Sequence, residues 1–389
     1  MALANLMLHV WNEDLPKNIT IGTHNGHFHT DEVLAVGLLK FLFGDDHDIK
    51  IIRTRDQNLL DTMDIVVDVG KIYDPIKRRF DHHQSGCNET FDQFNKIPLS
   101  SAGMVYKHMG RDIITKFYDT KLDDEFRQKI CTSGSNSGTV SLDELIDAVY
   151  IDMYKTFIKE IDAIDNGVTM IKEAFTPPSN AYNYHQQLHM GNHVRNLNGD
   201  DPSNDNFQME QFHEAMKLTW WIFSIHLKNS FKYQYSFLHD RAPMTEAFTS
   251  RIHPNILFMH DTFPTWRQHL KELDTKNEIK FTAYPKNSQR TEWGFGTMQV
   301  PGQQFKNQID LLPENVLKGL LFAPNDLIFV HKNLFCGSAK TSQTAFDACE
   351  LSYNKRPTDY ANYHNTFRTV GLFFTGYLIG YFIQSHYHK

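Results

Sequence analysis

Three short apolar runs near the start of the chain each end in histidine or aspartate residues, and this arrangement limits the fold more than any other feature. The runs lie at 19–24, 64–70 and Arg79–Phe80, and a fourth apolar run lies at 48–54. Between the first and the fourth, residues 31–43 have apolar side chains at helical spacing. Short apolar strands separated by helices are typical of a parallel sheet that is covered on both faces. We therefore predict an α/β fold for the first half of the chain.

The length of 389 residues allows two domains, each with its own core. Residues 176–206 are rich in Pro, Asn, Gly and Asp, which predicts a linker there. We expect helices at 142–165 and 207–238, and strands at 279–284, 293–300 and 328–330. The predicted divisions are a parallel-sheet domain at 19–175, a smaller α+β domain at 207–353 and a tail at 354–389.

The residues that follow the predicted strands form a pattern of possible metal ligands. His24, His29 and Asp31 follow the first strand with the spacing H-x4-H-x-D. Asp68 ends the strand at 64–70, and the tripeptide Asp81-His82-His83 follows Arg79–Phe80. Asp162 and Asp165 lie near the end of a predicted helix. Because ligands bind outside the carboxyl ends of parallel strands, we expect these groups to converge on one crevice.

The donor types in this pattern indicate which metal would bind. Imidazole and carboxylate groups without thiolates favour Mn²⁺ or Mg²⁺ over structural zinc. The 4 cysteines are scattered and form no C-x-x-C pair, which fits a reducing intracellular compartment. Two ions that share the carboxylate of Asp68 would suit hydrolysis of a phosphoester. Taken alone, Asp31 also fits a helix N-cap, with Glu32 favourable to the helix dipole, so it is the order of all the groups that indicates a metal site.

Several segments together resemble the Myg exonuclease family, a branch of the DHH phosphoesterase superfamily. The resemblance extends over roughly residues 19–353. The matching segments are IGTHNGHFHTDE at 21–32, IRTRD at 52–56, DIVVDVG at 64–70, RFDHHQ at 79–84, LSSAG at 99–103, EIDAIDNG at 160–167 and, more weakly, VRNLN at 194–198 and IFVHKNLFCG at 328–337.

The resemblance implies a DHH-type domain that holds the metals and a smaller C-terminal domain that holds the substrate. The implied activity is 3′-to-5′ exonucleolytic cleavage of RNA, and relatives act in RNA processing in the nucleus and mitochondria. Asp68, His82 and His83 would be the catalytic residues. The implied metal ligands are His24, His29, Asp31, Asp68, His82 and His83, completed by Asp81, Asp162 or Asp165. The family often has a Gly-Gly-His-like turn where this chain has Cys336-Gly337-Ser338.

An RNA substrate also requires cationic groups for its phosphates. The candidates in the first half are Arg53, Arg55 and Arg79. Those in the second half are Arg195, His331, Ser338 and Lys340. The formal net charge of −7 excludes general electrostatic binding of nucleic acid over the whole surface, so RNA contacts must come from a local basic patch or from the metals.

The two ends of the chain differ in what they indicate about location. Residues 1–17 contain Glu13 and Asp14 but no Arg, so they resemble neither a transit peptide nor a secretory signal. Residues 369–385 are uncharged and mostly apolar, and Gly376 and Gly380 form a G-x-x-x-G pair. One interpretation is a tail anchor in a membrane, and the other is a tail that packs on its own domain. The expected location is intracellular, in the nucleus, mitochondrion or cytoplasm.

Three functions from different classes fit the sequence. The first is a metal-dependent 3′-to-5′ RNA exonuclease. The second is a small-molecule phosphoesterase or pyrophosphatase of the DHH type, which the acidic net charge leaves open. The third is a non-catalytic RNA-binding or scaffold protein. Nothing in the sequence indicates an oligomeric state.

Overall fold

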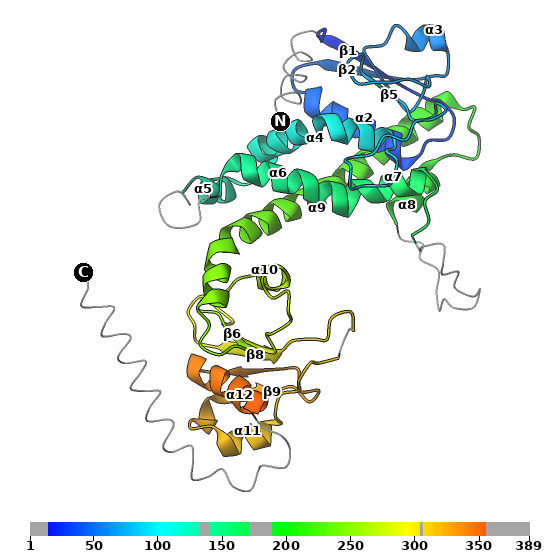
Figure 1. The fold of residues 1–389 in the computed structure, drawn as a ribbon. Helices are drawn as coiled ribbons and strands as arrows, with labels where there is room; N and C mark the ends of the chain where they lie inside the picture. The colour runs from blue at the N-terminus through cyan, green and yellow to red at the C-terminus, as the bar shows by residue number, and fades with distance from the viewer. Residues whose placement is uncertain (1–14, 133–139, 171–188, 304–305, 355–389) are drawn as a thin grey trace, which may run out of the picture. The chain divides into compact units, whose positions relative to one another are not determined.

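The structure of the protein is a computed structural model that describes residues 15–132, 140–170, 189–303 and 306–354. The chain divides into two compact units, Met1–Tyr235 and Ser236–Lys389. Within these described ranges, each unit contains one five-stranded sheet. Figure 1 labels many of the helices and strands of the two units.

The sheet of the first unit is mainly parallel. Its strand order is β2-β1-β3-β5-β4, and only β4 runs antiparallel to its neighbour β5. Ile19, Ile21 and all of β3 are buried, as expected for strands covered on both faces. The predicted parallel-sheet fold is therefore confirmed. The strands are β1 (Asn18–Thr23), β2 (Asp48–Arg53), β3 (Ile65–Val67), β4 (Tyr73–Asp74) and β5 (Arg79–Phe80).

The helix α2 (Thr30–Phe43) packs against α4 (Ser101–Lys121). Every residue of α2 from 31 to 39 is buried. A helix buried in this way normally has apolar residues throughout. This one begins with Asp31 and Glu32, both with almost no exposed surface. Buried carboxylates need partners, so the start of α2 is the first structural indication of a site.

A helical segment is present at 142–165 as predicted, but it is not one regular helix. It consists of α6 (Leu142–Met153), a π-helical turn η2 (Tyr154–Ile158) and α7 (Lys159–Asp165). Single π-helical turns inside α-helices occur often at functional sites. Here the turn directly precedes the helix that ends at Asp165. The other helices of this unit are α3 (Gln57–Leu60), α5 (Asp124–Thr132) and α8 (Met190–Leu197).

The long helix α9 (Asp205–Thr249) crosses the boundary between the two units. Sequence reasoning placed the linker at 176–206 and began the second domain at 207, whereas the units divide after Tyr235. The cause is the packing of the first part of α9. The ring of Phe212 makes an edge contact with Phe28, and Phe231 stacks on Phe117. These apolar contacts assign the first thirty or so residues of α9 to the first unit.

The second unit has a mixed sheet with the order β6-β7-β8-β10-β9, in which only β6 and β7 are parallel. Its core contains Phe281, Trp293 and Phe295 with the buried side of α12. The predicted α+β character is confirmed. The strands are β6 (Ile256–Phe258), β7 (Phe281–Pro285), β8 (Trp293–Thr297), β9 (Leu327–Val330) and β10 (Cys336–Ala339), and the helices are α10 (Trp266–Leu273), α11 (Glu314–Leu320), η3 (Pro324–Asp326) and α12 (Ser342–Asn354).

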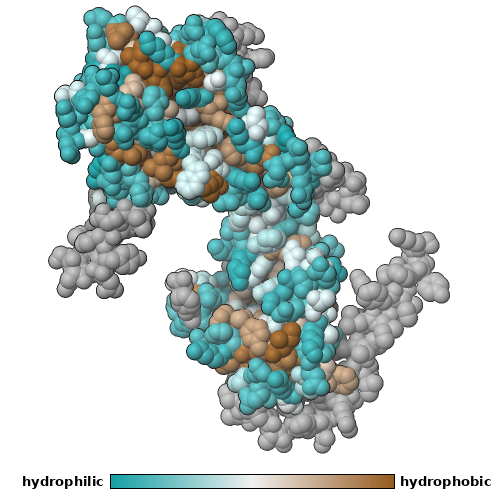
Figure 2. All heavy atoms as spheres, turned by 180° about the vertical axis from the view of Figure 1, so that it is seen from behind, coloured by the Kyte–Doolittle hydropathy of each residue, from teal (hydrophilic) through white to brown (hydrophobic). Residues whose placement is uncertain are grey.

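The predicted membrane anchor at 369–385 and the tail to which it belongs lie outside the described residues. Among the helices that the structure does describe, none is both long and apolar enough to cross a membrane. The face shown in Figure 2 is mainly hydrophilic, with hydrophobic residues among the others in both units. Trp221 in the first unit and Phe322 in the second are examples of large exposed apolar side chains.

Candidate metal centre

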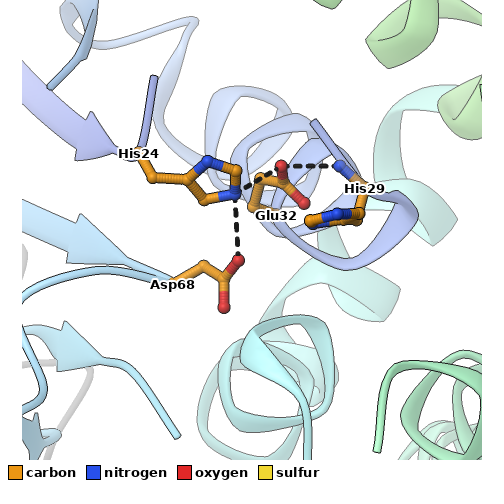
Figure 3. Close-up of side chains that lie close together, drawn as sticks. All are labelled: His24, His29, Glu32 and Asp68. Carbon is orange, nitrogen blue, oxygen red and sulfur yellow. Dashed lines mark hydrogen bonds and ion pairs between the residues drawn. The ribbon is translucent and has the colours of Figure 1, made fainter. Parts of the chain in front are cut away.

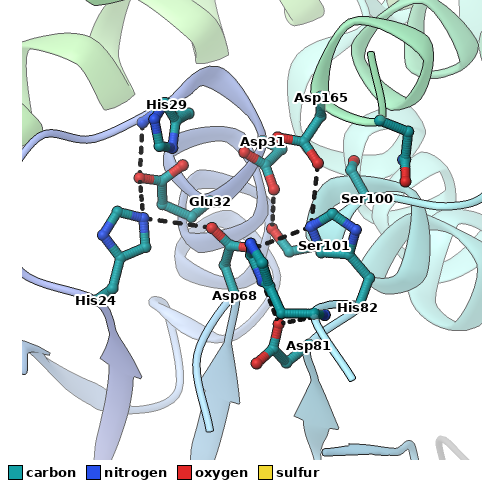
Figure 4. A network of polar contacts seen from close by, with 12 residues as sticks. His24, His29, Asp31, Glu32, Asp68, Asp81, His82, Ser100, Ser101 and Asp165 are labelled. Atoms are coloured by element: carbon teal, nitrogen blue, oxygen red, sulfur yellow. Dashed lines mark hydrogen bonds and ion pairs between the residues drawn. The ribbon is translucent and has the colours of Figure 1, made fainter. Parts of the chain in front are cut away.

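Three neighbouring parallel strands each end next to one of the predicted metal ligands. His24 follows β1, Asp68 follows β3, and His82 follows β5 by two residues. Because β1 pairs with β3 and β3 pairs with β5, the three strand ends are adjacent. Figure 4 shows side chains from the strand ends facing side chains from the helices. The structure thus brings together the groups that sequence reasoning expected to converge.

The start of α2 supplies further donors beside His24. His29 is the N-cap residue, and its backbone N–H donates to Glu32 Oε1 over 2.7 Å. The same oxygen lies 2.9 Å from His24 Nε2, which lies 3.3 Å from Asp68 Oδ2 (Figure 3). One donor atom from each of these four residues lies within 4.8 Å of the others. Ligands held at about 2.1 Å from one cation lie roughly 3–4 Å apart, so the spacing suits a metal ion.

A second group of donors lies on the other side of Asp68. It consists of Asp31, His82 and Asp165, again with donor atoms within 4.8 Å. His82 Nε2 lies 3.0 Å from Asp165 Oδ2, an ion-pair distance, although the two atoms do not meet the geometry of a hydrogen bond. Asp31 Oδ1 is buried and has no hydrogen-bond partner among the described residues. Because buried polar atoms are nearly always hydrogen-bonded, a cation between these three side chains would complete their contacts.

Asp68 connects the two groups. Its Oδ2 lies 3.3 Å from His24 Nε2, and its Oδ1 lies 3.4 Å from His82 Nε2. One carboxylate oxygen therefore faces each group. Its backbone has a φ of 58°, in the left-handed region that non-glycine residues rarely adopt. Strain of this kind is retained where it aims a functional side chain, and here it directs the carboxylate between the two groups.

The structure separates the two aspartates of α7, which the sequence left as alternatives. Asp165 lies in the second group, next to His82. Asp162 Oδ1 instead accepts hydrogen bonds from the Ser100 backbone N–H at 3.0 Å and from Ser100 Oγ at 2.7 Å. Ser100 is the N-cap of α4, so Asp162 supports the helix start rather than the donor groups. Any side chain at Gly103 would clash with the Asp162 carboxylate.

Asp81 and His83 have a different geometry from the other predicted ligands. Asp81 is buried, and its Oδ1 lies 2.7 Å from His83 Nδ1. Its Oδ2 accepts a hydrogen bond from the backbone N–H of Lys71. Both oxygens are thus occupied within the protein. The side chain of His83 is 56% exposed, and its Nδ1 also lies 3.6 Å from Asp68 Oδ1. Asp81 therefore orients His83, which lies at the open side of the cluster.

The pKa values reflect the crowding of buried carboxylates. Burial raises the pKa of Asp31 well above its usual value, and the charges of Asp68 and Asp165 raise it further. Burial would lower the pKa of His24, but contacts with Asp68 and Glu32 outweigh it and raise this pKa to about 10. The same balance, with Asp165 and Asp68 as partners, raises the pKa of His82 to about 10. Protons thus neutralise charge that a bound cation would otherwise neutralise.

The residues present fit two divalent cations. Unpaired buried oxygens and nitrogens remain in the second group, and Asp68 has one oxygen for each group. Oxygen and imidazole donors without thiolate suit Mn²⁺ or Mg²⁺. His24, His29 and Asp68, next to Glu32, would hold one ion. Asp31, His82 and Asp165, with the other oxygen of Asp68, would hold the second.

A cavity of about 1070 Å³ opens over these donor groups. The described residues that line it all belong to the first unit. Phe157, Ile161 and Ile164 form an apolar wall, while Arg55 and Lys71 supply positive charge. Further lining residues come from α8 and from His189, which precedes it. The cavity is large enough for a substrate bigger than a single phosphate group.

Of the arginines predicted to bind substrate, only Arg55 and Arg195 line the cavity. The guanidinium of Arg53 donates to the carbonyls of His24 at 3.2 Å and Gly26 at 2.6 Å, and it lies over the rings of Phe28 and Phe212. Arg79 likewise donates to carbonyls, including that of Met63 at 2.9 Å. Both arginines support the backbone near the site.

The remaining predicted substrate residues belong to the second unit. Ser338 is a buried residue of β10, while His331 follows β9 and Lys340 follows β10. The backbone N–H of His331 donates to Cys336, and that of Lys340 donates to Asp326. Within their own unit, His331 and Lys340 therefore lie at opposite ends of the β9–β10 pair. Their role in substrate binding stays a prediction.

Sequence reasoning missed several residues of the site. Glu32 was interpreted as a helix-dipole residue, but its side chain lies within the first donor group. Ser101 Oγ donates to Asp31 Oδ2 over 2.8 Å and so holds that ligand in place. The sequence signal for both was adjacency to predicted site residues. His189 and His193 line the cavity, yet no local signal distinguished them from the other histidines.

Comparisons with known proteins identify relatives over nearly the whole chain. The family model MYG1_exonuc, described as uncharacterised protein family UPF0160, matches residues 20–353. The MYG1 protein of Dictyostelium discoideum is 31% identical over 359 residues, covering 88% of this chain and 98% of the relative. The MYG1 exonuclease of Mus musculus is 31% identical, covering 87% and 85%. That of Homo sapiens is 30% identical, covering 86% of each chain.

Solved structures give only distant matches. A manganese-bound exonuclease RecJ matches 90% of this chain and 92% of its own at 11% identity, with a TM-score of 0.24. CDC45 from Entamoeba histolytica matches 90% and 98% at 10% identity, with a TM-score of 0.26. Scores at this level do not establish a shared fold.

Proposed function

The chain belongs to the MYG1 exonuclease family, and from this membership and the geometry of the site we propose that it is a metal-dependent 3′-to-5′ RNA exonuclease. The observation on which the proposal mainly rests is the position of Asp68. Its two carboxylate oxygens face two separate groups of imidazole and carboxylate donors. Two cations held close together by a shared carboxylate can stabilise both the attacking and the leaving oxygen in in-line hydrolysis of a phosphodiester.

When bound, the pair of cations would supply an activated water and neutralise charge on the phosphorus and leaving oxygen. The protein residues hold the donors for this chemistry in place. Ser101 holds Asp31, and the strained backbone of Asp68 directs its carboxylate between the two groups. Fixed donors lower the cost of reorganisation during the reaction.

His83 is the side chain best placed to contact the substrate. Its Nδ1 is held by Asp81 at 2.7 Å, which leaves Nε2 for a phosphate oxygen or the leaving group. The side chain of His83 is 56% accessible, against 3% for His24 and 11% for His82. His83 thus combines a fixed ring with access to the cavity.

The experiment that tests this function compares RNA labelled at either end. Metal-free protein should be inactive, and added Mn²⁺ should restore stepwise release of nucleotides from the 3′ end. With a 5′ label this gives a ladder of shortening products, whereas a 3′ label gives a labelled mononucleotide at once. Pyrophosphate and mononucleotides serve as further substrates in the same assay. Cleavage of these without cleavage of RNA would replace the proposal with a small-molecule phosphoesterase, and no cleavage of any substrate would contradict catalysis.

A further inference from the structure

The cavity over the donor groups has nitrogen donors that the proposed reaction does not use. They are His189, the N-cap residue of α8, and His193 and Arg195 within α8. We propose that this side of α8 is a phosphate-binding subsite, which takes a phosphate of the RNA backbone next to the one that is cleaved. This inference rests on the proposed nuclease function and specifies how that site distinguishes an oligonucleotide from a small phosphoester.

The first argument is that α8 is fixed to the loop that presents the metal ligands. The side chain of Asn198, which follows α8, accepts a hydrogen bond from the Phe28 N–H at 2.8 Å and donates to the Phe28 carbonyl at 2.9 Å. His27 Nε2 lies 3.1 Å from the Gly199 carbonyl oxygen. Both contacts join α8 to the short loop between His24 and His29. The donors of α8 therefore have a set position relative to the first donor group, which favours binding by preorganisation.

The second argument concerns what these donors contact. His189 Nδ1 is buried and has no hydrogen-bond partner among the described residues. His193 and Arg195 are exposed to the cavity, and neither forms an ion pair with a described carboxylate, although carboxylates line the same cavity. A guanidinium binds phosphate in a bidentate manner, and imidazole nitrogens add further donors. An anion at this side of α8 would satisfy His189 Nδ1, which has no hydrogen-bond partner among the described residues, and would pair with the guanidinium of Arg195.

The third argument is the distribution of charge around the donor groups. Arg55 and Lys71 line the cavity from the sheet side, and Arg195 lines it from α8. A substrate whose single phosphate lies at the donor groups cannot contact the cationic groups on both sides of the cavity. The successive phosphates of an oligonucleotide can contact both sides. The arrangement therefore favours the backbone of a single-stranded oligonucleotide over an isolated phosphoester.

The test compares two substrates that differ in their number of phosphates. One is a ten-nucleotide RNA, and the other is bis(p-nitrophenyl) phosphate, which has a single phosphate. The double variant His193→Gln with Arg195→Gln should raise KM for the RNA about tenfold and leave hydrolysis of the small substrate within about twofold of wild type. Arg195→Lys alone should recover part of the RNA affinity. Lys121→Gln, at an exposed lysine outside the cavity lining, is the matched control and should change neither substrate.

A binding measurement keeps this test independent of catalysis. Fluorescence anisotropy of labelled RNA with metal-free protein reports affinity without hydrolysis. The double variant should weaken binding about tenfold, and the slope of log K against log salt should fall by roughly 0.7 for each phosphate that the variant no longer binds. An unchanged slope and affinity in the variant would overturn the subsite. Failure of the wild type to cleave either substrate would instead contradict the proposed function, whatever the binding result.

Discussion

The two five-stranded sheets of the protein place the residues at their strand ends in opposite ways. In the first sheet β1, β3 and β5 are parallel, so His24, Asp68 and His82 follow three carboxyl ends at the same edge. In the second sheet β9 and β10 are antiparallel, so His331 and Lys340 follow carboxyl ends at opposite edges. The four residues of β10 separate these edges by about 13 Å at 3.3 Å per residue. Parallel pairing concentrates polar strand ends, and antiparallel pairing disperses them.

The two units also differ in how buried polar atoms without a hydrogen bond are grouped among the described residues. In the first unit such atoms include those of Asp31, Asp68, His82 and Asp165, which lie together, whereas in the second unit they belong to His269 and Ser338. A buried carboxylate of the second unit, Asp240, instead has its oxygens beside Thr265 Oγ1 at 3.0 Å and His239 Nδ1 at 3.2 Å. Its hydrogen bonds satisfy it without a metal. The comparison therefore predicts that similar substitutions will affect the two units differently.

The largest expected difference in activity is between the variants Asp68→Asn and Asp240→Asn. Asp68→Asn removes charge from the residue that faces both donor groups, so hydrolysis of RNA should fall by roughly 10³-fold or more. Asp240→Asn should lower the free energy of unfolding by about 1 kcal/mol and leave activity intact. Steady-state kinetics and urea denaturation of both variants provide the measurement. Equal activity of the two variants would contradict this difference between the two units.

A second comparison lies within α7. Asp165→Asn should lower activity by roughly 10²–10³-fold, because it removes a donor beside His82. Asp162→Asn keeps an acceptor for Ser100 and should retain most of the activity. Isothermal titration with Mn²⁺ should show weaker binding for the Asp165 variant alone. If the Asp162 variant loses metal and the Asp165 variant does not, the assignment of these two residues is reversed.

Two arginines allow a matched test of support for the site. Arg53 donates to two carbonyls of the His24 loop, and Arg251 of the second unit donates to Phe248 at 2.6 Å and lies over its ring. Replacing either by Met should lower stability. Only Arg53→Met should also weaken Mn²⁺ binding, by roughly 10- to 100-fold, as is usual for residues that orient metal ligands. Identical Mn²⁺ affinities in the two variants would show that Arg53 supports only the fold and not the metal ligands.

The smallest expected effect is a change in pH dependence. Burial, as the largest cause, raises the pKa of Asp162 to about 7, against hydrogen bonds from Ser100 that lower it. The folded protein then binds more protons than the unfolded chain between about pH 4 and pH 7, so this group makes stability fall as pH rises through that range. Asp162→Asn should remove this contribution. In thermal unfolding of metal-free protein, the melting temperature of the variant relative to that of wild type should be higher at pH 8 than at pH 5.

Local patterns predicted the parallel sheet and most of the donor groups. Short apolar runs that end in His24, Asp68 or Asp81 indicate both the strand and its polar end, because the two features are adjacent in sequence. The position of α8 could not be predicted in this way, since the pairing of Asn198 with Phe28 joins residues 170 positions apart. The division within α9 was missed for a similar reason. The contact of Phe212 with Phe28 is tertiary, and helical periodicity does not reveal it.

The most direct test of the central claim is the number of Mn²⁺ ions bound per chain, measured by titration with electron paramagnetic resonance detection. We expect two ions per wild-type chain, with a spectrum in which the two spins are magnetically coupled through a shared carboxylate. A double variant, Asp31→Asn with Asp165→Asn, should bind one ion without coupling, and Asp68→Ala should lose the coupling. A single ion in the wild type, or two coupled ions in the Asp68→Ala variant, would contradict a bridging role for Asp68.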